Sequence, residues 1–232
     1  MCQILIPENF ASRLLSEIES DENVIDAIEK IVKTLAKRKY ITDLSWLDHC
    51  ILPDNLIPNK TSFKKIWDLH PEEHLNIRIY GKLIPVPRWQ QSYGKNYEFS
   101  GIIAKGIDIP DELLPYFDFA NSMGYSGKFN SALLNWYKDG NHYISSHADG
   151  VTKLLPDSPI ITITLCLPGE PRIFRIRDKN KGILKDITTT NGLVLVMGGK
   201  FQNELKHEIV KMTGKRAEKA GSRISITLRQ FK

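Results

Sequence analysis

The feature that most constrains the fold is a run of short apolar segments in the second half of the chain. Glycine, proline, asparagine or aspartate separates the segments, and no helical period lies between them. Strands that follow one another without helices pair antiparallel and pack as a sandwich or barrel. We therefore expect a jelly-roll core, a double-stranded β-helix. The six segments are 131–138, 160–167, 172–177, 192–199, 207–212 and 223–231.

The beginning of the chain has a different pattern. Apolar residues recur at helical spacing over 24–35 and more weakly over 10–18. These patterns predict a helical N-terminal extension at 1–44, followed by the main domain at 45–232. The expected fold class is α+β, a jelly-roll core with N-terminal helices.

Between the extension and the strand-rich half, three further elements are expected. A helix begins at Thr61 or Ser62, and a strand with alternating apolar residues covers 75–79. A second helix runs from Pro110 to about Ser122, with proline and acidic residues in its first turn.

Composition narrows the class of protein. The 41% hydrophobic and 25% charged residues are typical of a globular chain, and no apolar run approaches the ~18 residues of a membrane span. Three widely spaced cysteines, Cys2, Cys50 and Cys166, fit neither a disulfide framework nor a zinc site. We expect a soluble, intracellular monomer without a membrane partner, in the nucleus or the cytoplasm. The net charge of +5 permits nucleic acid as a partner without requiring it.

Two histidines and an aspartate could bind a metal ion. His147 and Asp149 are two residues apart, and in an extended segment such residues point to the same side. His207 is the one histidine downstream of them and begins a predicted strand. Two histidines and one carboxylate form the facial triad of non-haem Fe(II) oxygenases. A lone histidine is more often a core or surface residue, so the triad alone is a weak signal.

The last predicted strand alternates strictly over 223–229. Three apolar side chains face one way, and the two arginines, Arg223 and Arg229, face the other way together with Ser225 and Thr227. Arginine is rarely buried without a partner, so this polar face points either to solvent, on an edge strand, or into a cavity that holds an anion. A dicarboxylate such as 2-oxoglutarate would suit the second arrangement.

Together these residues resemble the motifs of the AlkB family of Fe(II)/2-oxoglutarate dioxygenases. The likeness covers roughly 45–232 and is greatest to the homologues that repair duplex DNA. In those relatives the segment over the substrate base is similar to 79–94 and 96–101 of this chain. The ordered motif blocks are Asn135-Trp136-Tyr137, His147-Ala148-Asp149, His207, and Arg223 to Arg229.

The resemblance implies roles for these residues and a set of cofactors: Fe(II), 2-oxoglutarate as co-substrate, and O2. Iron would be bound by the two histidines and the aspartate. Arg223 would bind the distal carboxylate of 2-oxoglutarate, helped by Tyr137 and Ser225. Asn135 and Arg229 would contact the keto-acid end of 2-oxoglutarate, with Thr227 nearby.

The resemblance also implies the reaction. An N-alkyl carbon on a nucleobase is hydroxylated while 2-oxoglutarate becomes succinate, and the hydroxyalkyl group then leaves as an aldehyde. The expected substrates are 1-methyladenine and 3-methylcytosine in duplex or single-stranded DNA, with RNA as a further candidate. The function is direct reversal of alkylation damage.

A base must leave the stack to be repaired, which requires a pocket and a side chain that fills the gap. By resemblance, Tyr97 and Phe99 are the pocket aromatics and Tyr80 is the wedge. The alternative for Tyr80 is an ordinary tyrosine at a strand end. Nucleic-acid backbone contacts would come from Gly81, Lys82 and Arg88.

Several alternatives stay open. Gly150 and Val151 stand where the duplex-repairing relatives have acidic residues, which leaves the preferred base undetermined. Two basic runs, at 172–185 and 211–219, extend the nucleic-acid footprint or are simply solvated. One rival function is an oxygenase of the same class that acts on a protein side chain or a small molecule. Another is a non-catalytic jelly-roll module that binds nucleic acid.

Overall fold

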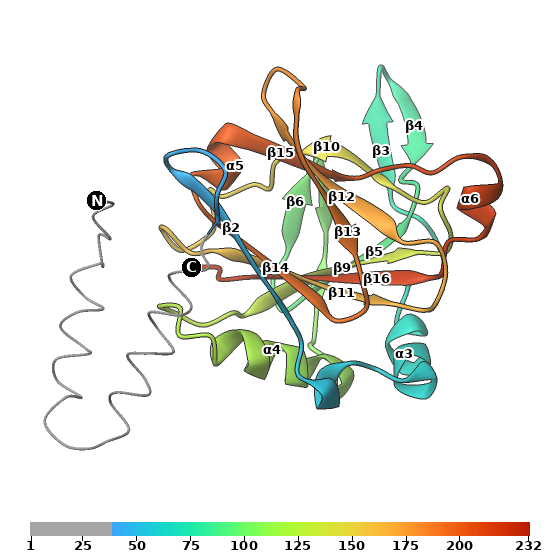
Figure 1. Ribbon diagram of the computed structural model, residues 1–232, viewed down its shortest axis with the longest axis horizontal. Coiled ribbons are helices and arrows are strands. Elements are labelled where there is room, and N and C mark those ends of the chain that lie inside the picture. The colour runs from blue at the N-terminus through green and yellow to red at the C-terminus, as the bar shows by residue number, and fades with distance from the viewer. Residues whose placement is uncertain (1–38) are drawn as a thin grey trace, which may run out of the picture. The chain divides into compact units, whose positions relative to one another are not determined.

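Two β-sheets pack face to face and form the core of the computed structural model (Figure 1). The structure describes residues 39–232, so the helices expected within 1–38 lie outside the described residues, and the predicted domain boundary at 44/45 stays a prediction. The larger sheet has eight strands in the order β1 (Lys39–Tyr40), β2 (Ser45–Ile51), β14 (Leu193–Gly199), β11 (Ile160–Cys166), β16 (Arg223–Arg229), β9 (Ser131–Tyr137), β5 (Trp89–Tyr93) and β8 (Gly106–Ile107).

The smaller sheet and two hairpins complete the strands. This arrangement confirms the jelly-roll prediction, and all six segments expected to be strands are strands: β9, β11, β12, β14, β15 and β16. The smaller sheet has the order β10 (Ile144–His147), β15 (Leu205–Ile209), β12 (Arg172–Asp178) and β13 (Ile183–Thr189). The hairpins are β3 (Asn76–Ile79) with β4 (Lys82–Pro85), and β6 (Tyr97–Phe99) with β7 (Ile102–Ala104).

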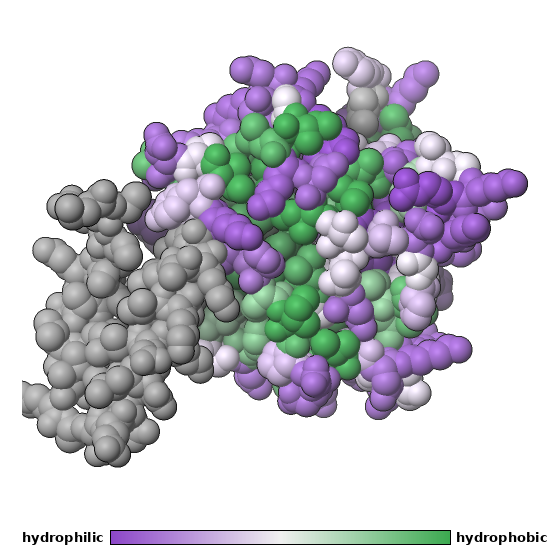
Figure 2. Space-filling model, viewed as in Figure 1, coloured by the Kyte–Doolittle hydropathy of each residue, from purple (hydrophilic) through white to green (hydrophobic). Residues whose placement is uncertain are grey.

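Strand β13 was not expected from the sequence. It lies at the edge of the smaller sheet, paired with β12 alone. Its first two residues, Ile183 and Leu184, are 53% and 47% exposed. Figure 2, in the same view as Figure 1, shows apolar residues at the surface. The apolar and polar residues of β13 do not alternate. The sequence there therefore lacks the two-residue repeat by which a half-buried strand is predicted.

Helices α3 (Lys60–Trp67) and α4 (Leu114–Asn121) lie on the face of the larger sheet that points away from the smaller sheet (Figure 1). Helix α3 begins after Asn59, whose side-chain oxygen accepts hydrogen bonds from the backbone N–H groups of Thr61 and Ser62. The predicted start at Thr61 or Ser62 was therefore late, because asparagine supplies the N-cap. The other helices are η1 (Asp54–Leu56), η2 (Asp111–Leu113), α5 (Phe201–Glu204) and α6 (Gly214–Glu218).

The larger sheet buries both of its faces, and this decides where the polar residues of β16 point. Ile224, Ile226 and Leu228 pack with the residues of α3 and α4. The opposite face of the same strand points toward the smaller sheet, where residues of both sheets form a second apolar cluster. β16 lies in the middle of the larger sheet, between β11 and β9, so the alternative of an edge strand with its arginines in solvent is wrong. None of the described helices is long and apolar enough to cross a membrane.

Gly198 shows how closely β14 and β2 of the larger sheet are packed. It pairs with Trp46 of β2, and a Cβ at this position would collide with the indole ring. We expect Gly198→Ala to destabilise the fold by about 1–3 kcal/mol, the usual range for an overpacked site. Gly150→Ala is the matched control, since a Cβ there meets no atom within 4 Å. Denaturant unfolding measures both, and equal midpoints would contradict the prediction.

Candidate metal centre and adjoining cavity

A cavity of about 600 Å³ lies between the two sheets. Its walls come from β9 and β16 of the larger sheet and from β10 and β15 of the smaller sheet. The base of the β3–β4 hairpin and strand β6 with the turn after it line the cavity as well. Strands that are far apart in the sequence therefore contribute polar side chains to one enclosed space.

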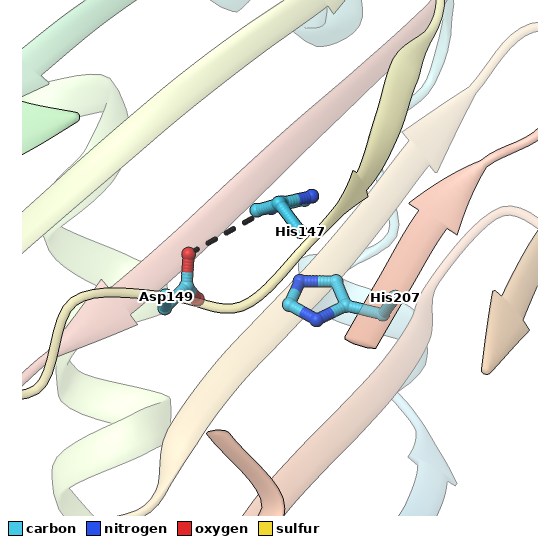
Figure 3. Close-up of side chains that lie close together, drawn as sticks. All are labelled: His147, Asp149 and His207. Carbon is cyan, nitrogen blue, oxygen red and sulfur yellow. Dashed lines mark ion pairs between the residues drawn. The ribbon is translucent and has the colours of Figure 1, made fainter. Parts of the chain in front are cut away.

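His147, Asp149 and His207 meet at this cavity (Figure 3). Strand β10 pairs with β15 so that His147 lies opposite His207, with ring centroids 4.3 Å apart. Asp149 follows β10 by two residues, and its Oδ1 is 3.8 Å from His147 Nε2. One ligand atom from each residue lies within 4.8 Å of the others. The three predicted ligands can thus bind one ion.

The hydrogen bonds around the two histidines leave nitrogen lone pairs free. His147 Nδ1 lies 2.9 Å from the carbonyl oxygen of Ser145, and since a carbonyl only accepts, Nδ1 carries the proton. Nε2 is then the free ligand atom, as in metal sites where a backbone carbonyl fixes the tautomer. His207 has a buried Nδ1 without a hydrogen-bond partner, and its ring stacks on Phe174 at 5.3 Å.

Asp149 is held at three points. Tyr97 donates its hydroxyl to Oδ1 at 2.9 Å, and Arg229 Nη2 contacts the same oxygen at 3.0 Å. The backbone N–H of Asp149 donates to Gln202 Oε1 at 2.8 Å. The second carboxylate oxygen, Oδ2, is buried and has no hydrogen-bond partner within the described range 39–232. A buried polar atom without a partner is costly, so Oδ2 fits a metal ligand.

The electrostatics of the three residues suit a divalent cation. Burial raises the pKa of Asp149, but the charge of Arg229, the two histidines and the hydrogen bond from Tyr97 outweigh it, and the pKa lies below its usual range. Burial lowers the pKa of His147, and burial together with the neighbouring His147 lowers the pKa of His207 to about 3. At neutral pH the set is two neutral imidazoles and one carboxylate, the form that binds metal.

The polar face of β16 forms the floor of the cavity next to these ligands. Arg223, Ser225, Thr227 and Arg229 all line the cavity, and each is less than a tenth exposed. Arg223 donates to Thr164 Oγ1 at 3.0 Å, while its Nε and Nη1 are buried and have no hydrogen-bond partner in the part of the chain that the structure describes. Such unpartnered donors fit an anion such as a carboxylate.

Asn135 and Tyr137 of β9 pair with Ser225 and Arg223 of β16, and both line the cavity. Asn135 Oδ1 accepts hydrogen bonds from Arg88 Nε and from Gln90 Nε2, each at 2.8 Å. Arg88 is only 5% exposed, so its guanidinium lies in the cavity wall beside Asn135 rather than on the surface.

The expected substrate-binding residues fall on the two hairpins. Tyr80 and Gly81 form the turn between β3 and β4 with positive φ angles of 47° and 79°, as a type I′ turn requires. Tyr80 is 100% exposed and Lys82 is also exposed. Tyr97 and Phe99 stack at 5.9 Å and line the cavity.

Trp89, the residue after Arg88, does not line the cavity. It stacks on His70 at 4.4 Å and packs against the core. In the basic runs, Arg175 pairs with Asp186 and Arg177 with Glu208, and each pair has a 2.7–2.8 Å contact. These arginines therefore already have carboxylate partners within the protein.

Other residues of the site were missed from the sequence. Gln202, Thr164 and Gln90 each bond a residue of the site, across 45 to 59 positions of sequence. No local pattern marks them, because their contacts depend on the sheets being assembled.

Comparisons with known proteins agree with this site. A model of the 2OG-Fe(II) oxygenase superfamily matches residues 80–229. The human DNA oxidative demethylase ALKBH2 is 34% identical over 110 residues, which are 45% of this chain and 40% of that protein. The mouse DNA oxidative demethylase ALKBH2 is 33% identical over 110 residues, 45% of this chain and 43% of that protein. The match thus spans about two fifths of the length of these relatives.

A solved structure of OsALKBH1 has the same fold, with a TM-score of 0.52 at 16% identity over 83% of this chain and 99% of that chain. The range matched by the superfamily model contains the metal ligands and the polar face of β16. The cofactors implied by the superfamily are Fe(II), 2-oxoglutarate and O2, and the free Oδ2 of Asp149 and the unpartnered Arg223 fit them. The chain is similar to the AlkB-like DNA oxidative demethylases named above, and it belongs to the 2OG-Fe(II) oxygenase superfamily.

Proposed function

We propose that this dioxygenase removes alkyl groups from nucleobases in DNA, of the 1-methyladenine and 3-methylcytosine type, and so reverses alkylation damage directly. The observation that carries the proposal is the β3–β4 hairpin, whose base lines the cavity while Tyr80 at its tip is fully exposed. An enzyme that oxidises a small molecule has no use for an aromatic side chain projecting there. The names of the matched relatives, DNA oxidative demethylases, support the same substrate class.

In this proposal His147, Asp149 and His207 bind the iron. Tyr97 and Arg229 keep the carboxylate of Asp149 ionised and fix Oδ1, while Oδ2 has no partner among the described residues. When bound, iron and 2-oxoglutarate with O2 supply the oxidant that hydroxylates the N-alkyl carbon. The protein's own contribution is to hold both histidines neutral and the carboxylate charged, and to enclose the site between the sheets.

The co-substrate lies along β16 in this proposal. Arg223 binds its distal carboxylate, next to Tyr137 and Ser225, because two of its donors have no other partner. The keto-acid end lies toward the iron, beside Asn135, Thr227 and Arg229. Arg88 and Gln90 orient Asn135 by donating to its oxygen, which leaves the amide NH2 of Asn135 as the group that can donate to the keto acid.

The target base enters the cavity between the hairpins. Phe99 offers a stacking face there, and Tyr80 fills the gap that the flipped base leaves in the duplex. Gly81 and Lys82 follow Tyr80 on the same exposed tip and contact the nucleic-acid backbone. Gly150 has no side chain to contact the edge of the base, so the exocyclic groups of the base are recognised elsewhere in the pocket.

The first test measures succinate formation and loss of methyl from duplex and single-stranded oligonucleotides that contain 1-methyladenine, with Fe(II) and 2-oxoglutarate. We expect coupled turnover by the wild type and loss of at least about 100-fold in His147→Ala, since a triad ligand is removed. His49→Ala is the control, because His49 is exposed on β2 and lies outside the cavity lining. Succinate without demethylation would reject the DNA substrate and keep the oxygenase.

Tyr97→Phe tests the support of Asp149. The substitution keeps the ring that lines the cavity and removes the hydroxyl that donates to Oδ1. We expect weaker binding of Mn(II), used in place of Fe(II), by about 10-fold or more, the usual effect of losing a hydrogen bond to a metal ligand. Tyr93→Phe is the matched control, since the Tyr93 hydroxyl contacts the Leu69 carbonyl at 3.4 Å, away from the metal ligands. Equal metal affinity in both variants would reject this role.

Tyr80→Ala tests the hairpin tip. Only a duplex has a gap to be filled, so we expect the rate on double-stranded substrate to fall about 10-fold while the rate on single strands changes little, in line with an unstacking cost of a few kcal/mol. Tyr40→Ala removes another exposed tyrosine, on β1, and serves as the control. Equal losses on the two substrates would remove the wedge assignment.

A further inference from the structure

Arg172 is a buried arginine whose charge has no carboxylate partner among residues 39–232. It begins β12 and is only 2% exposed. Nη1 donates to the carbonyl oxygen of Asp139 at 2.9 Å, and Nη2 donates to the carbonyl oxygens of His142 and Val210 at 2.7 and 2.9 Å. Its Nε is buried without a partner. Carbonyl dipoles solvate a guanidinium but leave its net charge in place.

Arg172 and Arg223 lie against the same aromatic ring. The Cζ atom of Arg223 is 4.9 Å from the centroid of the Tyr137 ring, and the Cζ atom of Arg172 is 5.8 Å from it. Tyr137 is buried, and it lines the cavity beside Arg223, whereas Arg172 lies outside the lining. Tyr137 therefore links a cation inside the cavity wall to a second cation behind it.

The two arginines repel each other in a poorly solvated region. Burial and then the neighbouring Arg223 lower the pKa of Arg172 to about 10, while Tyr137 and Asp139 act in the opposite direction. Burial also lowers the pKa of Arg223. Among the described residues Arg172 forms no ion pair, and the side chain of Asp139 accepts the backbone N–H of Asn141. An anion bound at Arg223 would relieve this excess of positive charge.

We propose that Arg172 is a positioning residue for the distal carboxylate of 2-oxoglutarate. It fixes the Tyr137 ring beside Arg223 and adds a second buried positive charge at that end of the cavity. The inference rests on the proposed assignment of Arg223 to this carboxylate. Its consequence is selectivity, since a dicarboxylic keto acid gains from the second charge and a monocarboxylic keto acid does not.

Binding of two keto acids to the full chain loaded with Mn(II), which prevents turnover, tests the inference by titration calorimetry. 2-Oxoglutarate is compared with 2-oxopentanoate, which has the same keto-acid group and chain length but no distal carboxylate. Arg172→Gln removes the charge, and Arg175→Gln is the matched control on the same strand. Arg175 is paired with Asp186 at 2.7 Å and lies outside the cavity lining.

We expect Arg172→Gln to weaken 2-oxoglutarate binding about tenfold and to leave 2-oxopentanoate binding unchanged, so that the preference between the two falls about tenfold. Arg175→Gln keeps the wild-type preference. An unchanged preference in Arg172→Gln, or equal weakening of both ligands, would show that Arg172 is merely structural and overturn the inference. If Arg172→Gln does not fold, Arg172→Lys is measured instead. This variant retains the charge, so the preference for 2-oxoglutarate over 2-oxopentanoate should stay within about threefold of the wild-type value. A larger loss of the preference in Arg172→Lys would overturn the proposal.

A wild type that binds neither keto acid fails in a different way. That outcome contradicts the proposed function and the assignment of Arg223. Binding of both keto acids by the wild type, together with no effect of Arg172→Gln on the preference, contradicts the role of Arg172 alone.

Discussion

The buried carboxylate of Asp149 is the constraint on which the rest of the site depends. An ionised carboxylate inside a protein costs several kcal/mol unless charges and hydrogen bonds compensate it. Arg229 lies on β16 and Tyr97 on the β6–β7 hairpin, and both contact the same oxygen, Oδ1. These contacts draw β16, β6 and the segment after β10 to one point. The other oxygen, Oδ2, is buried and has no partner among the described residues, so the carboxylate keeps a free lone pair next to the two histidines.

Each of the two sheets contributes a different set of side chains to the site. The smaller sheet presents both histidines, because the pairing of β10 with β15 places them opposite each other. The larger sheet presents the polar faces of β9 and β16, whose register sets Asn135 beside Ser225 and Tyr137 beside Arg223. The cavity lies where the sheets face each other, so neither sheet alone could form it. Rigid strands on both sides hold the groups more precisely than loops would.

The parts predicted well from the sequence are those set by local periodicity. The spacing of His147 and Asp149, and the alternation along 223–229, follow from the two-residue repeat of extended backbone, and the structure keeps both on one side. The arginines point into a cavity and not to solvent because β16 lies in the middle of its sheet. The sequence of one strand does not reveal its place in a sheet. The bond from Tyr97 to Asp149 spans 52 residues, and aromatic stacking alone was expected of Tyr97. Arg172 appeared in the sequence only as one member of a basic run.

The arginines of the site differ in whether a carboxylate compensates their charge. The two ends of the cavity therefore differ in charge. Arg229 is compensated by Asp149, so the end of β16 near the metal ligands carries little excess positive charge. Arg223, at the other end of the strand, has a neutral threonine as its partner and Arg172 behind the Tyr137 ring. A divalent cation is therefore favoured at one end and a carboxylate at the other. In the proposed function, a dicarboxylic keto acid that chelates the metal would therefore satisfy both ends in one orientation, with its keto-acid group toward Asp149 and its distal carboxylate toward Arg223.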